Sequence, residues 1–340
     1  MPTCGVWSMA ELKLEQFEHH EESSVWSTFL DQAEASIFQR PSFLAYHGEE
    51  KFPAEQFQPH HIGVMRKGKP VAFLPATRVL RDDGTWQLRS PFASSHGGFV
   101  WAPKISISAM EEVIGSVLEA GRSVADSMTI GVLPSCYDAM ERSGASAWLL
   151  RAAGGVCVAS DLLLGVPVSP AAAAEEDALL AGLPTKERTA WRRARKGAFT
   201  VRVEEGCSAE AHAVLAAAWS RFEQPLTHSL DDLQRIERCC PGTIRTVVVE
   251  GDAGCVAGVV LFRVNGVGVN SFYIFDDGAH RRDGVALLGA VEAIAETARW
   301  GCRWLDYGAS NFGTTPHHTL IHFKESLGGR AVERQTFAFS

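Results

Sequence analysis

The sequence predicts an α/β (α+β) protein of two tandem domains, each with a mixed central sheet flanked by helices. Its 340 residues exceed one ordinary domain, because globular domains hold about 150 residues each. Both halves carry strand hairpins, then a crossover helix, then another strand. A Pro- and Ala-rich stretch at 166–176 separates the halves. We therefore expect domains at 1–168 and 169–340.

In the first half, apolar residues recur at helical spacing and predict a helix at 25–35. Strands at 62–65 and 71–79 flank a short basic turn that contains a glycine, which predicts a hairpin. A loop of small residues, 90–99, follows. The half closes with an amphipathic helix and a buried strand, at 109–125 and 128–133.

The second half repeats this order without visible identity to the first, which predicts a structural duplication. It opens with a basic helix at 185–196. Turn signals rich in Gly, Asn and Asp punctuate the segments after it. The later strands are expected at 199–203, 243–250, 256–264, 267–275, 303–307 and 332–338, and the helices at 209–222, 230–239, 284–300 and 319–327.

The composition limits the class of protein. Hydrophobic residues make up 46% and charged residues 21% of the chain, as in soluble globular proteins. The N-terminal residues lack the pattern of a signal peptide, and no apolar run approaches the roughly 20 residues of a membrane span. We expect a cytoplasmic protein without membrane insertion. The net charge of −8 argues against a surface devoted wholly to nucleic acid.

The chemistry of the chain is expected at the turn that precedes the helix at 284–300. Arg281, Gly284 and Ala286 follow the pattern Arg-x-x-Gly-x-Ala, with Arg282 beside them. A helix N-terminus carries about half a positive charge and unpaired amides, and glycine lets an anion approach the backbone closely. The alternative is an ordinary strand-to-helix turn with two solvated arginines.

Downstream segments carry a resemblance to a known family. The chain reads Trp304-Leu305-Asp306-Tyr307-Gly308-Ala309-Ser310 and then Phe323-Lys324-Glu325-Ser326-Leu327-Gly328-Gly329. With the basic helix, and more loosely the loop at 90–99, these segments resemble the FemAB-like branch of the GNAT acetyltransferase superfamily, which includes the Fem-type aminoacyl ligases. The resemblance covers most of the chain and implies two tandem GNAT-like domains, the second catalytic. It also implies that the turn at 281–286 holds the pyrophosphate of coenzyme A.

The resemblance nominates Lys324 as a catalytic residue, because the lysine of the Phe-Lys motif lies at the reaction centre of Fem-type ligases. An ammonium there would stabilise the tetrahedral oxyanion of amide formation. Asp306 or Tyr307, at a strand end, could take a proton from the acceptor amine. Alternatively, Asp306 only caps the following turn. Ser310 and Phe323 are expected at the substrate.

The basic helix is a second anion-binding candidate. It presents Lys186, Arg188, Arg192 and Arg195, and the last three share one face. A phosphate-bearing substrate, coenzyme A or a tRNA acceptor arm would fit, and a solvated basic helix is the alternative. His96, in the loop at 90–99, is expected at the substrate as a base that titrates near neutrality. No metal is expected.

These features favour an N-acyltransferase that moves an acyl group from acyl-CoA to a small-molecule amine by direct attack. An aminoacyl-tRNA-dependent Fem-type ligase, adding an amino acid to a small molecule or cell-wall precursor, is the alternative. A non-catalytic binding protein that kept the fold is the third possibility.

Overall fold

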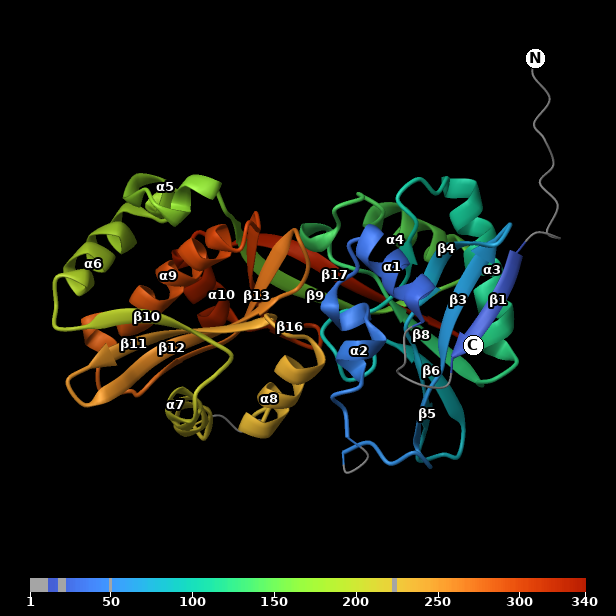
Figure 1. Ribbon diagram of the computed structural model, residues 1–340, viewed down its shortest axis with the longest axis horizontal. Helices are drawn as coiled ribbons and strands as arrows, with labels where there is room; N and C mark the ends of the chain where they lie inside the picture. The colour runs from blue at the N-terminus through green and yellow to red at the C-terminus, as the bar shows by residue number, and fades with distance from the viewer. Residues whose placement is uncertain (1–11, 18–22, 49–50, 222–224) are drawn as a thin grey trace, which may run out of the picture. The chain divides into compact units, whose positions relative to one another are not determined.

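The computed structural model describes residues 12–17, 23–48, 51–221 and 225–340 (Figure 1). The chain divides into two compact units, Met1–Ser160 with Arg334–Ser340, and Asp161–Glu333. The sequence placed the boundary after residue 168, but the division falls inside strand β9 (Val156–Pro167). The Pro- and Ala-rich composition marks the loop after this strand. The end of the last strand, β17 (Arg330–Phe339), returns to the first unit.

The first unit contains two groups of strands. One is an antiparallel sheet in the order β1 (Leu12–Phe17), β3 (His61–Arg66), β4 (Lys69–Leu74) and β7 (Val100–Trp101). The other has the order β17, β8 (Ser127–Gly131), β6 (Trp86–Ser90), β5 (Thr77–Leu80) and β2 (Phe57–Pro59). In this second group the pair β6–β8 is parallel, and the pairs β17–β8, β5–β6 and β2–β5 are antiparallel.

The helices of the first unit are α1 (Ser24–Gln32), α2 (Pro41–Leu44), α3 (Ile107–Arg122) and α4 (Ser143–Ala152), with short 3₁₀ turns at Ile37–Gln39 and Ser135–Tyr137. Ser106 caps α3 by accepting from the backbone N–H of Ala109. The apolar face of α3, including Met110, Val113 and Val117, is fully buried in the core of this unit. The spacing of these residues explains why the sequence predicted this helix.

The second unit is built on six strands in the order β10 (Thr200–Glu205), β11 (Ile244–Gly251), β12 (Gly254–Arg263), β13 (Gly268–Asp276), β14 (Trp304–Ala309) and β9. Strands β10 to β13 pair antiparallel, β13 and β14 pair parallel, and β14 pairs antiparallel with β9. Helix α9 (Val285–Arg299) connects the parallel pair. A parallel pair requires such a crossover, which the sequence predicted.

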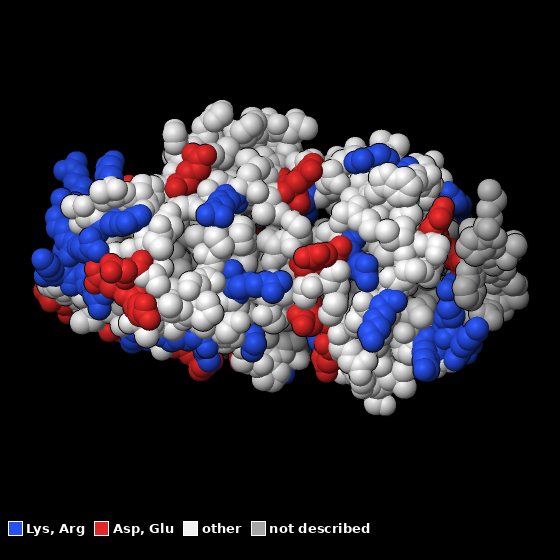
Figure 2. All heavy atoms as spheres, turned by 90° about the horizontal axis from the view of Figure 1, so that it is seen from above, with Lys and Arg blue, Asp and Glu red and all other residues white. Residues whose placement is uncertain are grey.

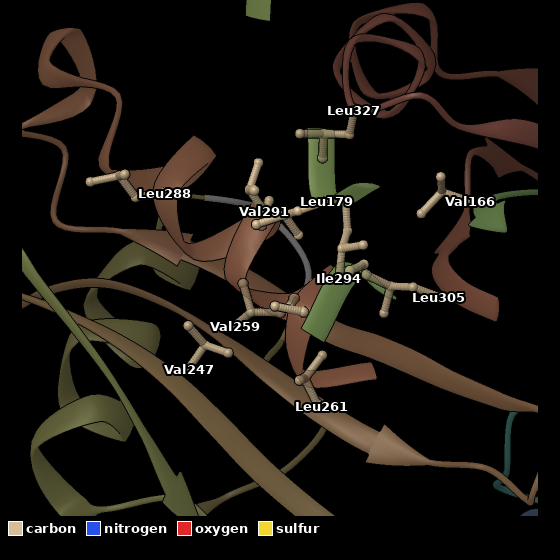
Figure 3. Close-up of a cluster of buried hydrophobic side chains, with 14 of the residues drawn as sticks. Val166, Leu179, Val247, Val259, Leu261, Leu288, Val291, Ile294, Leu305 and Leu327 are labelled. Atoms are coloured by element: carbon tan, nitrogen blue, oxygen red, sulfur yellow. The ribbon is translucent and has the colours of Figure 1, made fainter. Parts of the chain in front are cut away.

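Helices cover both faces of strands β11 to β13 (Figure 1). Alternate strand residues such as Val247, Val259 and Leu261 face Val291 and Ile294 of α9 (Figure 3). On the other face, the Tyr273 ring lies 5.1 Å from Trp219 of α7 (Ala209–Trp219). Burial on both faces explains the almost continuous apolar runs of these strands.

The remaining helices of the second unit are α5 (Glu176–Leu180), α6 (Thr185–Arg195), α8 (Leu230–Cys239) and α10 (His318–Ser326), with 3₁₀ turns at Pro170–Ala173 and Arg281–Asp283 and a small hairpin of β15 (Asn311–Phe312) and β16 (Thr315–Pro316). Helices α5 and α6 both pack against α9. Since α9 is covered by the sheet on one side and by these helices on the other, most of its residues are buried.

The predicted α/β class, with mixed sheets flanked by helices in both halves, is confirmed. The helix expected at 209–222 is α7, and residue 222 lies outside the described residues. Helix α4 and strand β9 had no counterpart among the predicted elements. In β9 the apolar/polar alternation is weak, and the five consecutive residues 156–160 are all exposed. None of the described helices has the length and apolar character of a bilayer span.

Two glycines with the same backbone conformation test how tightly the first unit packs. Gly98 and Gly84 both have a φ of +82°, but a Cβ at Gly98 would overlap the carbonyl oxygen of Gly131, whereas a Cβ at Gly84 meets nothing. Gly84→Ala should lower the free energy of unfolding by about 1 kcal/mol through backbone strain alone. Gly98→Ala should lower it by about 3 kcal/mol, because the backbone must also shift. Equal losses in chemical denaturation of the two variants would contradict this packing.

Candidate active site

The two parallel strands of the second unit pair over a short distance only. Gly268, Val269 and Asn270 of β13 pair with Trp304, Leu305 and Asp306 of β14, and the ladder then stops although both strands continue. We call this point the fork. It lies toward the carboxyl ends of the two parallel strands, the edge at which α/β sheets bind their ligands.

Buried polar side chains gather at the fork. Asp306 is 1% exposed, and one carboxylate oxygen accepts from Asn270 Nδ2 at 3.1 Å. The other accepts from the backbone N–H of Gly308 at 2.7 Å. The hydroxyl of Ser271 donates to the Asp306 carbonyl oxygen at 3.0 Å. The geometry therefore fits both alternatives for Asp306. Its side chain caps the turn at Gly308, and it also places a buried carboxylate at the fork.

Lys324 reaches the same place from α10. Its ammonium donates to the carbonyl oxygens of Gly308 (2.8 Å) and Ala309 (2.7 Å) and to Ser310 Oγ (3.0 Å). An ammonium has three donors, so all of them are used within the protein. Lys324 is 3% exposed and Ser310 is fully buried. The lysine therefore fixes the irregular end of β14, where Gly308 has a φ of +77°.

The electrostatic state of Lys324 follows from its burial. Loss of hydration lowers the pKa of Lys324 from 10.5 to about 8, and the Asp306 carboxylate opposes this shift. The side chain is thus charged at neutral pH and titrates in the mildly alkaline range. Lys324 is therefore not a surface lysine, which was the alternative to the motif-based prediction.

Tyr307 does not fit its predicted role. Its side chain lies in the apolar core of the second unit, 4% exposed, and its hydroxyl donates to the Leu327 carbonyl oxygen at 3.3 Å. Burial raises the pKa of this phenol far above its ordinary value. A phenol in this state does not accept a proton from an amine near neutrality. Phe323 is partly buried and packs against the same core.

The turn at 281–286 leads from the end of β13 into α9. Gly284 is the residue before the helix and has a φ of +81°, in the left-handed region that favours glycine. No side chain of the described residues caps the first turn of α9. The first amides of this 15-residue helix, including that of Ala286, are therefore available to an anion.

The two arginines of this turn differ. Arg281 donates through Nε to both carboxylate oxygens of Asp276, at 2.9 and 3.2 Å, and so braces the turn. Arg282 is exposed. Of the predicted pair, Arg282 is the one whose side chain is not committed to an ion pair within the described part of the chain.

The basic helix α6 lies against the start of α9. A Cβ added to Gly284 would come 3.3 Å from the Cβ of Ala194, so glycine at this position permits the close approach. The structure thus brings together two segments that the sequence singled out separately. In Figure 2, Lys and Arg side chains gather where Figure 1 places α6, with acidic side chains beside them.

Much of the predicted basic face is engaged within the protein. Arg188 donates to the carbonyl oxygens of Leu183 and Ala181, at 2.8 and 3.3 Å. Arg192 and Arg195 pair with Glu176, at 2.8 and 3.7 Å. Lys186 is exposed. The helix therefore offers fewer uncommitted positive charges than its sequence indicates.

His96 belongs to the first unit, and its predicted titration near neutrality is not supported. The ring is 1% exposed and lies between Phe38 and Tyr137, at centroid distances of 5.1 and 4.9 Å. Burial and, secondarily, the charge of Arg334 hold the pKa of His96 well below its ordinary value. A neutral, enclosed imidazole results.

Asn270 and Ser271 were not among the predicted site residues. Both hold Asp306 from the neighbouring strand. A signal was present, because these two polar residues interrupt the otherwise apolar strand at 267–275. However, Asn270 and Asp306 are 36 residues apart in the sequence. Only the pairing of β13 with β14 brings Asn270 and Ser271 to Asp306.

Comparison with solved structures gives matches over nearly the whole chain. FemX matches with a TM-score of 0.68 over 94% of this chain and 96% of its own, at 11% identity. A tandem GNAT protein from the clavulanic acid biosynthesis pathway matches with a TM-score of 0.53 over 97% and 98%, at 13% identity. The C-terminal domain of a putative lysylphosphatidylglycerol synthetase from Agrobacterium fabrum matches with a TM-score of 0.50 over 79% and 80%, at 13% identity.

By sequence, neither a protein-family model nor a curated protein matches the chain. The likeness therefore concerns the fold. It extends through both units, because each of the first two matches covers more than nine tenths of both chains. The chain thus has the fold of FemX and of the tandem GNAT protein, which is the fold that the resemblance of its motifs implied.

Proposed function

We propose that the protein is an acyltransferase whose second unit moves an acyl group from coenzyme A to an amine. The observation that carries this proposal is the arrangement at one edge of the sheet: the fork, the uncapped start of α9 and the helix α6. A thioester of a phosphorylated carrier needs an anion site and, within reach of it, a polar site for the reacting carbonyl. In this protein the uncapped start of α9 and the polar groups of the fork both lie toward the edge of the sheet at which the parallel strands end.

The pyrophosphate is held by the first amides of α9. Gly284 keeps the backbone accessible, and Arg282 supplies a positive charge beside it. Helix α6, with the exposed Lys186 in its first turn, contacts the start of α9 through Ala194 and adds positive charge to this part of the unit. The acyl group then lies toward the fork, because the turn at 281–286 follows directly on β13.

Amide formation proceeds by direct attack of the amine nitrogen on the thioester carbon. The C–N bond forms, the C–S bond breaks, and the proton of the amine leaves with the thiolate or to solvent. Lys324 serves as a positioning residue that stabilises the oxyanion through Ser310. Its ammonium donates to Ser310 Oγ, which leaves the proton of that hydroxyl to donate toward the carbonyl oxygen. Asp306 joins the two strands at the fork by accepting from Asn270, and it fixes the turn beyond by accepting from the Gly308 N–H.

An aminoacyl-tRNA-dependent ligase is the second candidate, favoured by the likeness to FemX over 94% of the chain. The engaged arginines of α6 favour the smaller donor. A tRNA acceptor arm requires several uncommitted positive charges along its path, and Arg188, Arg192 and Arg195 are all in contacts within the protein.

Binding of coenzyme A tests the anion site. Isothermal titration should detect coenzyme A binding to the wild type, and Arg282→Glu should weaken it about tenfold, because an attractive charge becomes repulsive. Arg122→Glu, an exposed arginine at the end of α3 in the first unit, is the matched control and should bind as the wild type does. Absence of binding to the wild type would overturn the coenzyme A assignment.

The donor class is tested separately. Release of free thiol from acetyl-CoA in the presence of a panel of primary amines should be insensitive to RNase. A ligase of the Fem type would instead transfer the amino acid from charged tRNA in a coupled aminoacylation assay, and RNase would abolish that activity. RNase-sensitive transfer from charged tRNA, without thiol release from acetyl-CoA, would favour the tRNA-dependent ligase.

The buried ammonium of Lys324 predicts a pH dependence of stability. The pKa is about 8 in the folded protein and 10.5 as a reference for the unfolded chain, so the unfolded state binds more protons between these values. The wild type should therefore gain stability relative to Lys324→Met as the pH rises from about 8 to 10.5. Urea denaturation at pH 7 and pH 10 measures this difference.

Lys104→Met, which removes an exposed lysine, controls for the loss of one positive charge and should follow the wild type across this range. In the acyl-transfer assay, Lys324→Met should lower kcat by about 100-fold while the variant remains folded. A folded variant with full kcat would remove Lys324 from the mechanism, whatever its effect on stability.

A further inference from the structure

The two faces of strand β14 have different surroundings. Leu305 of β14 and Val166 of the neighbouring strand β9 belong to the core that also contains Ile294 of α9 (Figure 3). Because side chains alternate along a strand, Trp304 and Asp306 point to the opposite face. The face away from α9 therefore carries its own side chains at the fork.

The indole of Trp304 fills a space that Gly165 of β9 leaves on this face. A Cβ added to Gly165 would come within 2.5 Å of Trp304 Nε1 and 2.7 Å of Trp304 Cε2, so the ring lies directly over this glycine. Gly165 pairs with Asp306 in the antiparallel ladder of β9 and β14. Directly opposite residues of such a pair point to the same face and lie about 5 Å apart. The ring thus leans from its own position toward the fork, and its N–H lies at the level of the Asp306 carboxylate.

The indole N–H of Trp304 lacks a hydrogen-bond partner in the described part of the chain, although its nitrogen is buried. The N–H of Trp101 in the first unit, by contrast, donates to Ser146 Oγ at 2.8 Å. Leaving a buried donor unsatisfied is costly, so such a group in a folded protein requires an explanation. A ligand oxygen at the fork would supply the missing partner.

The position of this N–H relative to α9 indicates which substrate it would contact. Val285, the first residue of α9, belongs to the same core as Leu305. The start of α9, where the proposed function places the pyrophosphate, is therefore on the Leu305 side of the sheet. A donor held there brings its acyl group to the fork from that side. The opposite face, with Asp306 and Trp304, is left for the acceptor.

Trp304 and Asp306 differ in the hydrogen bonds they can form. Asp306 places on this face a carboxylate, which accepts from the N–H groups of an amine. An indole N–H only donates, so it requires a hydroxyl or carbonyl oxygen. An acceptor with an amine alone would leave the Trp304 N–H unsatisfied, whereas an amine that also carries an oxygen would satisfy it. Sites built around such a polar contact discriminate strongly against ligands that lack it.

We propose that Trp304 selects acceptor amines that also carry a hydroxyl or carbonyl oxygen, by donating its indole N–H to that oxygen. Amino alcohols, amino sugars and amino acid amides belong to this class. The inference rests on the proposed function for the reaction itself and adds the class of acceptor to it.

Ethanolamine and n-propylamine are matched probes, because a hydroxyl in the first replaces a methyl group in the second. In protein labelled with nitrogen-15 tryptophan, the Trp304 indole signal is assigned by its loss in Trp304→Phe, or in Trp304→Tyr where the first variant does not fold. Ethanolamine should shift the proton of this signal downfield in a saturable way, because a hydrogen bond forms, and n-propylamine should not. Absence of the shift, or an equal shift with n-propylamine, would overturn the inference.

Kinetics and stability together distinguish binding from a structural role. The ratio of kcat/KM for ethanolamine to that for n-propylamine should fall about tenfold in Trp304→Phe, and the denaturation midpoint should stay at the wild-type value because no hydrogen bond is lost. Trp101→Phe, which loses its bond to Ser146, should show the reverse: a lower midpoint and a wild-type ratio. A destabilised Trp304→Phe with an unchanged ratio would make the indole purely structural and overturn the inference.

The NMR measurement needs no acyl donor, so its result is independent of coenzyme A binding. Failure of coenzyme A to bind, with the ethanolamine shift intact, would count against the proposed function and leave the Trp304 contact standing. A shift caused by acetyl-CoA but by neither coenzyme A nor ethanolamine would place the N–H on the donor carbonyl and overturn its assignment to the acceptor.

Discussion

The early end of the parallel ladder between β13 and β14 is the constraint on which the second unit depends. Where two strands part, backbone groups lose their partners, and each buried group left unpaired costs about 1–3 kcal/mol. Here side chains replace the ladder: Asp306 accepts from the Gly308 N–H, and Lys324 takes up the carbonyl oxygens of Gly308 and Ala309. The fork can therefore exist inside a closely packed domain.

This solution explains why a lysine is buried in the protein. Burial of an ammonium is unfavourable unless its donors are satisfied, and Lys324 has an acceptor for each of its three. The depressed pKa records the remaining cost of desolvation. In the acyl transfer proposed above, the ammonium that secures the end of β14 would also act on the oxyanion through Ser310.

Helix α9 determines where the proposed anion site lies relative to the sheet. It is packed against the sheet and against α5 and α6, so the position of its first turn is fixed by the core. Gly284 serves two purposes there, since it adopts a left-handed conformation and leaves room for Ala194 of α6.

Many elements could be predicted from the sequence, because apolar periodicity and turn residues are local properties. The helix at 284–300 and the strand at 303–307 correspond to α9 and β14 within one or two residues at each end. The turn at 281–286 and Lys324 were identified by motif, and Asp306 by its place at a strand end. These are features that a few neighbouring residues encode.

Tertiary structure alone decided which of these residues are available. Arg188, Arg192 and Arg195 look uncommitted in the sequence, yet their partners lie in the preceding segment, 176–183. Tyr307 and His96 are enclosed by residues distant in the chain, and burial sets their protonation. Asn270 joins the site only because β13 pairs with β14. The sequence by itself determined most of the elements and the residues that could carry chemistry, whereas burial and long-range contacts, which no local pattern encodes, decided which of those residues are exposed, paired or enclosed.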